Sequence, residues 1–171
     1  FMKKSVLITG GTKRFGKHLA LEFHKKGWEV LYTYFQSTER LAFGRCFQCD
    51  LRIPKERHAL LKELPAPIDA LINNASFFQA SYLENHESIL AESLQLHVQA
   101  PAFLSTHLGA KMKARGWGRI INVLDTLTLH GKAYPNYSAY HCGKYALMGL
   151  TKSLALDLAP EVTVNAIAPG F

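Results

Sequence analysis

The chain has 171 residues, of which 20 are Lys or Arg and 13 are Asp or Glu, so its formal net charge is +7. Hydrophobic residues make up 48% of it and charged residues 19%, which excludes an intrinsically disordered chain. Three cysteines are too few for a disulfide scaffold, and no apolar run approaches the roughly 18 residues of a membrane span. We therefore expect one globular, cytoplasmic domain without a membrane contact.

The basic residues are scattered along the chain and never form a dense run. Nucleic-acid binding needs basic and aromatic residues gathered on one surface, and the sequence has no such array. A small molecule that carries phosphate groups is enough to explain the excess of positive charge. We expect a small-molecule ligand and no nucleic-acid partner.

Apolar runs of strand length alternate along the chain with segments of helical period. The first strand, helix and second strand, at residues 6–8, 16–26 and 30–34, form one βαβ unit. Six strands interleaved with helices predict an α/β protein with a Rossmann-type, doubly wound parallel sheet in a single domain, residues 2–171. The other strands are expected at residues 45–48, 68–73, 119–123 and 162–168, and the other helices at 55–64, at 83–115 in two pieces, and at 138–158.

Two parts of this pattern are shorter than the fold normally requires. Between Tyr34 and Asp50 there is room only for a very short helix, at about residues 37–41. The sequence stops at Phe171, directly after the last expected strand, where such a sheet usually builds half of its ligand crevice. We expect the domain to be incomplete at its C-terminal side, lacking a last strand and the loop that covers the substrate.

A glycine-rich turn lies between the first strand and the first helix, at residues 9–16. Glycine permits a tight turn, and free backbone N–H groups at the start of a helix attract phosphate. The alternative is a plain turn between strand and helix, in which Lys13 and Arg14 are a solvated charge pair and not the ligands of a second phosphate. The residues expected to bind a dinucleotide here are Gly10, Thr12, Lys13, Arg14, Phe15 and Gly16.

The end of the second strand distinguishes between the two nicotinamide cofactors. Folds that select NAD usually carry an acidic residue there, about 20 residues after the glycines, to bind the ribose 2′-hydroxyl. In this chain residues 34–37 read Tyr-Phe-Gln-Ser, without a carboxylate. Because Lys13, Arg14 and the hydroxyl of Ser37 can bind a 2′-phosphate, we expect NADPH.

Tyr140 and Lys144 are four residues apart, which places both side chains on one face of the last expected helix. An ammonium group about 4 Å from the phenol, at an effective dielectric near 20, favours the phenolate by about 4 kcal/mol. That interaction would lower the tyrosine pKa by up to roughly three units and produce a proton donor suited to neutral pH. Taken alone, the pair is also a common coincidence on an amphipathic helix.

Further motifs give this pair its context. They are Asp50-Leu51, Asn73-Asn74-Ala75-Ser76, Tyr140-His141-Cys142-Gly143-Lys144 and Asn165-Ala166-Ile167-Ala168-Pro169-Gly170. Together with the glycine turn they follow the order and nearly the spacing of the short-chain dehydrogenase/reductase family, which the whole chain resembles. The resemblance implies Tyr140 as catalytic acid/base and Lys144 as its activator and ribose ligand. It also implies cofactor contacts by Asp50, Leu51, Asn73, Asn74, Ala75, Pro169 and Gly170, and a homotetramer built by helices at residues 90–112 and 145–158.

Three positions depart from the common pattern of that family. Arg14 replaces a Gly or Ala of the turn, Asp125 stands in place of the catalytic Ser, and His97 replaces an Asn in the long helix. Arg14, Asp125 and the run Asn-Asn-Ala-Ser-Phe-Phe at residues 73–78 resemble pteridine reductases and bacterial dihydromonapterin or dihydrofolate reductases. The resemblance implies that Ser76 and Phe78 face the pterin, with the Phe78 ring stacked on it.

Asp125 has a chemical role in this interpretation. Reducing a ring C=N bond requires a proton on nitrogen, and Asp125 beside Tyr140 can relay that proton or hold a water that does. The two residues are 15 positions apart, two more than usual in the family, so the loop at residues 129–136 is expected to be longer. If the alignment slips, Thr126 or Thr128 takes the usual serine role.

Several ordinary alternatives remain at this level. Asp125 can be a turn carboxylate, Phe78 can pack in a core or loop, and His97 can be either a satisfied buried histidine or a proton relay. Cys46 and Cys49 have metal-ligand spacing, but residues i and i+3 of a strand face opposite sides, so no metal site is expected. The leading prediction is an NADPH-dependent pterin or dihydrofolate reductase; the alternatives are a reductase of 3-oxoacyl thioesters or small ketones and a catalytically silent NADPH sensor.

Overall fold

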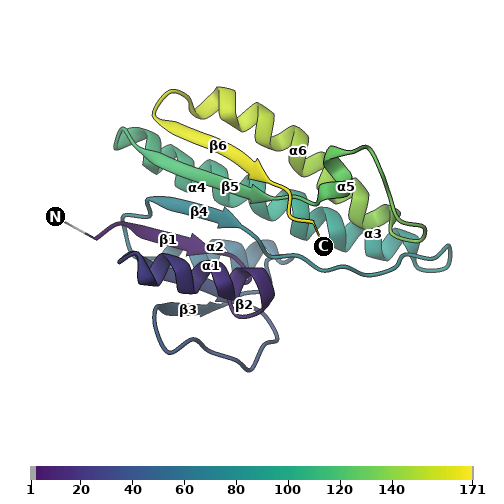
Figure 1. Ribbon diagram of the computed structural model, residues 1–171, viewed down its shortest axis with the longest axis horizontal. Helices are drawn as coiled ribbons and strands as arrows, with labels where there is room; N and C mark the ends of the chain where they lie inside the picture. The colour runs from purple at the N-terminus through teal and green to yellow at the C-terminus, as the bar shows by residue number, and fades with distance from the viewer. Residues whose placement is uncertain (1–2, 171) are drawn as a thin grey trace.

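A six-stranded parallel sheet runs through the computed structural model, which describes residues 3–170 (Figure 1). Its strand order in this part of the chain is β3-β2-β1-β4-β5-β6, which confirms the Rossmann-type, doubly wound α/β sheet. Residues 2 and 171, the expected ends of the domain, lie outside the described residues. The strands are β1 (Ser5–Ile8), β2 (Glu29–Tyr34), β3 (Arg45–Gln48), β4 (Ala70–Asn73), β5 (Gly118–Val123) and β6 (Val162–Ile167).

The inner strand β1 is an apolar run because both of its faces are covered. All four of its residues are buried, and Ile8 is in register with Tyr32 of β2 and with Ile72 of β4. The parallel register continues to β5, where Asn122 pairs with Asn73. The segments that follow β1, β4 and β5 therefore all start at one edge of the sheet.

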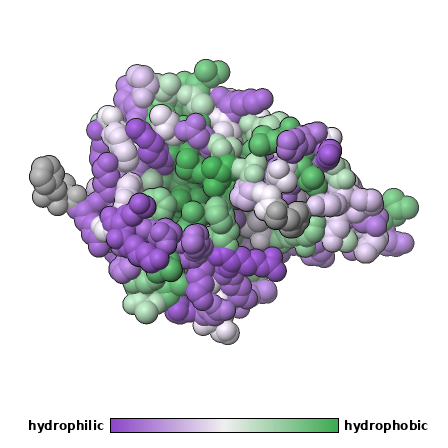
Figure 2. All heavy atoms as spheres, in the orientation of Figure 1, coloured by the Kyte–Doolittle hydropathy of each residue, from purple (hydrophilic) through white to green (hydrophobic). Residues whose placement is uncertain are grey.

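Helices cover the sheet in two layers (Figure 1). α1 (Arg14–Lys25) packs over Val6 and Ile8, while α2 (Pro54–Glu63), α4 (Ala100–Ala114) and α6 (Ser138–Leu158) pack on the opposite face. Figure 2 shows apolar residues gathered in the middle of the molecule in this view, where β4 and β5 lie beside α1, with hydrophilic residues around them. Among the described helices, none is long and apolar enough to cross a membrane.

The helical segment expected in two pieces at residues 83–115 is continuous from His86 to Ala114, and a π-helical turn interrupts its α-helical geometry. α3 (His86–Leu94) is joined to α4 by the π-helix η1 (Gln95–Gln99). A π-helical turn carries an additional residue and often marks a functional site. It contains His97, whose side chain is only 1% exposed.

The prediction of a short helix at residues 37–41 is wrong, because the structure has an irregular loop between β2 and β3. The hydroxyl of Ser37 accepts a hydrogen bond from the backbone N–H of Glu39 at 3.2 Å. The guanidinium of Arg40 donates to the carbonyl oxygens of Ser37 and Glu39, at 2.8 and 2.9 Å. Such local bonds compete with a helix for the same backbone groups.

Candidate active site

The glycine turn after β1 is held tightly against the segment that follows β4. Gly10 has a φ of +67°, and a Cβ atom there would come within 3.0 Å of the Cα of Ala75. A Cβ on Gly16 would collide with the carbonyl oxygen of Gly10 and with the side chain of Asn74. The amide of Asn74 donates to the carbonyl oxygens of Thr9 and Gly10, at 2.9 and 3.1 Å. This amide therefore holds the turn in place.

The first turn of α1 is open to an anion. Its N-cap residue, Lys13, makes no side-chain cap and the turn contains no acidic residue. Lys13 and Arg14 are exposed, and Phe15 is at the border of exposure, whereas Thr12 is buried. Uncapped N–H groups and the positive end of the helix dipole favour phosphate at this position.

Arg14 adopts a backbone conformation that glycine would adopt more easily. Its φ is +47°, in the left-handed region that costs an L-residue about 1–2 kcal/mol. This is the position at which the sequence departs from the glycine or alanine expected by resemblance. The chain thus carries a strained arginine at the start of α1, which makes this residue a candidate for a functional role.

A group of charged residues lies beside Ser37, where a 2′-phosphate is expected. Lys17 forms an ion pair with Glu39 at 2.9 Å, and Lys13 also lowers the pKa of Glu39 through its charge. The guanidinium carbon of Arg40 lies 3.3 Å from the centre of the Tyr34 ring. Sequence reasoning missed Lys17 and Arg40, because the loop after β2 was expected to be helical and its approach to α1 was not foreseen.

Asp50 and Leu51 follow β3 and are both buried. The guanidinium of Arg52 donates to both carboxylate oxygens of Asp50, at distances between 2.8 and 3.2 Å. This hydrogen bonding lowers the pKa of Asp50 below its usual range. The carboxylate expected near the adenine is therefore already engaged by a neighbouring cation.

Asn73 points into the core of the domain. Its amide donates to the side-chain oxygen of Asn122 at 2.8 Å and to the hydroxyl of Ser105 at 3.2 Å, and its side chain is 5% exposed. The backbone N–H groups of Asn74 and Ala75 both donate to the hydroxyl of Thr9 at 2.9 Å. Sequence reasoning missed Thr9 and Asn122 as the residues that fix this segment.

Tyr140 and Asp125 are brought together at the carboxyl edge of the sheet. The hydroxyl of Tyr140 donates to Asp125 Oδ2 at 3.2 Å, while Oδ1 accepts from the backbone N–H of Leu127 at 2.8 Å. Asp125 is the N-cap of the short helix α5 (Thr126–Leu129), so its carboxylate is fixed in position. Asp125 thus lies beside the phenol, whereas the hydroxyl of Thr128, one of the two alternatives by alignment, is buried without a hydrogen-bond partner.

The pKa of Tyr140 is raised, not lowered as the sequence predicted. Burial is the main cause, and the charge of Asp125 adds to it. The ammonium of Lys144 is directed elsewhere: it donates to the carbonyl oxygen of Val123 at 2.8 Å and lies 5.6 Å from the centre of the Tyr140 ring. Burial lowers the pKa of Lys144 itself to about 8. The i, i+4 spacing placed both residues on one helix face, but it did not fix where the ammonium would point.

An aromatic surface adjoins the phenol. Phe78 is 49% exposed and stacks on Tyr137, with ring centres 4.0 Å apart and 8° between the planes. The rings of Phe78 and Tyr140 meet edge to face, with their centres 4.9 Å apart. Ser76 is exposed on the same segment, and Pro169 reaches the edge through its carbonyl oxygen, which accepts from the N–H of Thr126 at 3.2 Å. Ser76 and Phe78 thus lie on the segment that faces the predicted catalytic pair.

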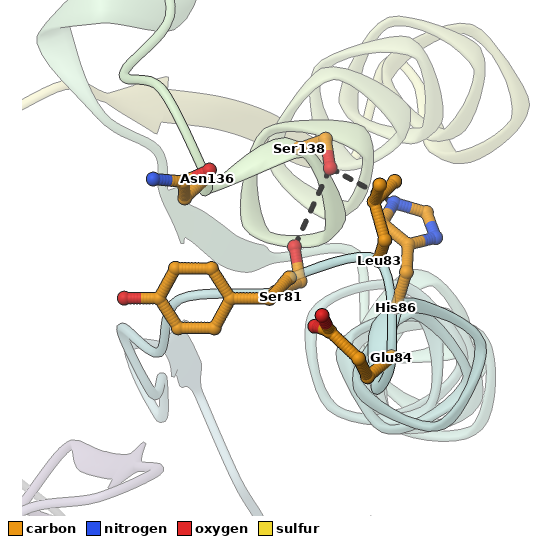
Figure 3. A pocket seen from close by; sticks show the side chains of 7 residues that line it. Ser81, Leu83, Glu84, His86, Asn136 and Ser138 are labelled. Carbon is orange, nitrogen blue, oxygen red and sulfur yellow. Dashed lines mark hydrogen bonds between the residues drawn. The ribbon is translucent and has the colours of Figure 1, made fainter.

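A cavity of about 600 Å³ lies between the segment after β4 and the start of α6 (Figure 3). Ser138 lines it, with its hydroxyl 2.8 Å from His86 Nε2 and 3.4 Å from the hydroxyl of Ser81. Glu84, Leu83, Tyr82 and Asn136 complete the lining. Tyr137, which stacks on Phe78, lies between Asn136 and Ser138, so this cavity adjoins the aromatic surface; sequence reasoning gave no signal for it.

Comparison with known proteins places this geometry in context. The sequence profile described as short chain dehydrogenase matches residues 4–171. A dihydromonapterin reductase of Enterobacter sp. (strain 638) is 36% identical over 183 residues, which cover 99% of this chain and 74% of the relative. A D-beta-hydroxybutyrate dehydrogenase of Rhizobium meliloti (strain 1021) is 32% identical over 191 residues, covering 99% and 72%. The structure of FolM alternative dihydrofolate reductase 1 from Brucella canis, complexed with NADP, matches with a TM-score of 0.86 at 27% identity over 98% of this chain and 73% of that one.

Proposed function

Since the chain belongs to the short-chain dehydrogenase family, we propose that this oxidoreductase uses NADPH to reduce a C=N bond of a pterin or dihydrofolate-type substrate. The observation that carries the proposal is the hydrogen bond from Tyr140 to Asp125, at 3.2 Å, beside the exposed ring of Phe78. A flat heteroaromatic substrate gains from an aromatic face, and a ring nitrogen needs a nearby proton donor. Dihydromonapterin reductase is also among the most similar relatives.

The glycine turn has the donors and the space that a dinucleotide requires. The uncapped start of α1 fits the pyrophosphate. A Cβ atom at Gly10 would crowd Ala75, so glycine is what allows the turn to lie so close to that segment. Lys13, Arg14, Arg40 and Ser37 would hold the 2′-phosphate of NADPH, which is why we prefer it to NADH. The Brucella canis structure with NADP supports the same preference. The other cofactor contacts proposed are Thr12, Phe15, Gly16, Asp50, Leu51, Asn73, Asn74, Tyr140, Lys144, Pro169 and Gly170.

When bound, NADPH would supply hydride to the substrate carbon, while this chain manages the proton. Tyr140 stays protonated at neutral pH, because burial and Asp125 raise its pKa. It can pass that proton to the substrate nitrogen, and Asp125, the acceptor of its hydrogen bond, can then take a proton from water and return it to the phenolate. Lys144, with an ammonium that donates to Val123 and a pKa near 8, retains donors for a ribose hydroxyl.

The second candidate is reduction of 3-oxoacyl thioesters or small ketones. It is favoured by the similarity to a D-beta-hydroxybutyrate dehydrogenase, since Tyr140 and Lys144 would serve that chemistry equally well. A silent NADPH sensor is the remaining alternative, and it predicts tight binding without turnover. We also propose a homotetramer through α4 and α6, where Leu156 is 82% exposed.

The experiment that tests the function measures loss of reduced-nicotinamide absorbance with a dihydropterin or an acetoacetyl thioester in parallel wells. Consumption only with the pterin supports the proposal, and consumption only with the thioester refutes the substrate class but not the fold or the role of Tyr140. Asp125→Ser is the matched variant, because it restores the usual residue of the family. We expect it to lose pterin turnover while ketone turnover, if any, is retained.

A further inference from the structure

A chain of hydrogen bonds connects the exposed Ser76 to the interior of the domain through His97. The hydroxyl of Ser76 lies 2.9 Å from His97 Nε2, and the hydroxyl of Ser93 lies 2.9 Å from His97 Nδ1. The hydroxyl of Ser93 also donates to the carbonyl oxygen of Ala139 at 2.7 Å. His97 is 1% exposed and Ser93 is fully buried, so no solvent competes for the bonds that Ser93 makes with His97 and Ala139.

The direction of each bond follows from the carbonyl at the end of the chain. A carbonyl oxygen only accepts, so the single proton of the Ser93 hydroxyl is used on Ala139. Ser93 must then accept from His97, which places a hydrogen on Nδ1. Burial and the nearby Lys144 charge lower the pKa of His97 well below its usual value, so the ring is neutral and Nε2 carries no hydrogen.

We propose that His97 fixes the polarity of Ser76, so that Ser76 Oγ donates inward to Nε2 and offers only lone pairs to the ligand. Its other contact, with the carbonyl oxygen of Phe77 at 3.5 Å, is too long to compete. The inference rests on the proposed function for its ligand: the site selects a heterocycle that presents an N–H donor to Ser76. A ligand with a carbonyl oxygen in that place would leave two acceptors facing each other.

The packing of α6 leaves room for this arrangement. A Cβ atom on Gly143 would lie 2.7 Å from the hydroxyl of Ser93 and 3.0 Å from His97 Nδ1. The helix can approach the two side chains so closely only because this residue is glycine. The rings of His97 and Tyr140 meet edge to face, with their centres 5.6 Å apart. The hydrogen-bonded chain therefore lies against the residue expected to carry the proton.

Nuclear magnetic resonance of the ¹⁵N-histidine-labelled protein, without any ligand, tests the polarity directly. We expect the His97 ring to be neutral, with hydrogen on Nδ1 and an unprotonated Nε2, between about pH 6 and pH 8. His97→Asn assigns its signals among those of the eight histidines. Ser76→Ala, at an exposed position, should shift only the Nε2 signal, because it removes the donor to that nitrogen. A hydrogen on Nε2, or a charged ring, overturns the proposal.

Binding of two pteridines of the same shape tests the selection. Pterin carries an amino donor where lumazine carries a carbonyl oxygen. We expect the protein with NADP⁺ to prefer pterin by about tenfold, and Ser76→Ala to reduce that preference to near equality. An equal affinity of the unchanged protein for both, or a preference that survives Ser76→Ala, contradicts the selection. If neither pteridine binds, the proposed function fails, while the resonance experiment still decides the polarity of Ser76.

Discussion

Replacing Asp125 by Asn isolates the effect of its charge on Tyr140. Asparagine is as good an N-cap as aspartate, so the bond to the N–H of Leu127 and helix α5 should be retained. At 3.2 Å, with an effective dielectric between about 20 and 80, the carboxylate disfavours the phenolate by about 1–5 kcal/mol. Because Asp125 is half-buried, we expect the lower part of this range, a fall in the Tyr140 pKa of about one to two pH units. The pKa of Tyr140 in this variant should still lie above its ordinary value, since burial is the larger cause of the shift.

Two assays measure that effect. Tyrosinate absorbance titrates Tyr140 without any ligand, with Tyr140→Phe to identify its contribution among the seven tyrosines. The alkaline limb of the pH–rate profile for pterin reduction should move down by the same amount, and kcat should fall by about 100-fold as the proton route is lost. Asp157→Asn, an exposed carboxylate at the far end of α6, is the matched control. An unchanged titration in Asp125→Asn would refute the electrostatic argument.

Three further substitutions, one of them with a matched control variant, have defined outcomes. Arg14→Gly should raise the urea midpoint and increase the free energy of unfolding by about 1 kcal/mol, because the φ of +47° is no longer strained. The same variant should bind NADPH about tenfold more weakly in a fluorescence titration. A loss of stability would contradict the strain. Gly143→Ala should lose about 1–3 kcal/mol by clashing with Ser93, whereas Gly149→Ala, with nothing near its Cβ position, should gain about 0.5–1 kcal/mol in the same unfolding measurement. Lys144→Met should be more stable than the unchanged protein at neutral pH, by up to about 3 kcal/mol, because the buried ammonium has a folded pKa of about 8. That advantage should shrink as pH rises from about 8 towards 10, where the unfolded lysine also loses its proton, and an advantage that does not change with pH would contradict the shift.

The repeating pattern of strands and helices was readable from the sequence, because parallel strands covered on both faces are continuous apolar runs. The helix predicted at residues 138–158 has the same bounds in the structure, since its apolar period is long and ends before Pro160. The loop at residues 37–41 could not be predicted in the same way. Its conformation depends on how Ser37 and Arg40 bond to nearby carbonyl and N–H groups, which residue type alone does not determine.

Spacing brought the predicted site residues to one edge, but it could not assign their partners. Asn73 matched a motif for cofactor binding, yet its amide is used by Asn122 across the sheet. Lys144 shares a helix face with Tyr140, yet its ammonium bonds to the carbonyl oxygen of Val123 on the strand below. Both partners come from β5, so the register of β4 with β5 reveals the first and the packing of α6 on the sheet reveals the second.

The two residues that depart most from the family pattern at the centre of the site act on hydroxyl groups in the same way. Asp125, where a serine is usual, accepts a hydrogen bond from the hydroxyl of Tyr140. His97, where an asparagine is usual, accepts one from the hydroxyl of Ser76. Asp125 presents only acceptor oxygens where a serine could also donate, and Nε2 of a neutral His97 presents an acceptor where an asparagine amide could donate. Before any ligand enters, the oxygen of Ser76 therefore presents lone pairs towards the cleft, while the proton of Tyr140 is directed to Asp125 until a substrate nitrogen takes it. A heterocycle that carries an N–H group near the reduced C=N bond is complementary to this pair of hydroxyl groups, whereas the ketone carbon of a 3-oxoacyl group is flanked by no N–H donor, and this favours the pterin over the thioester as substrate.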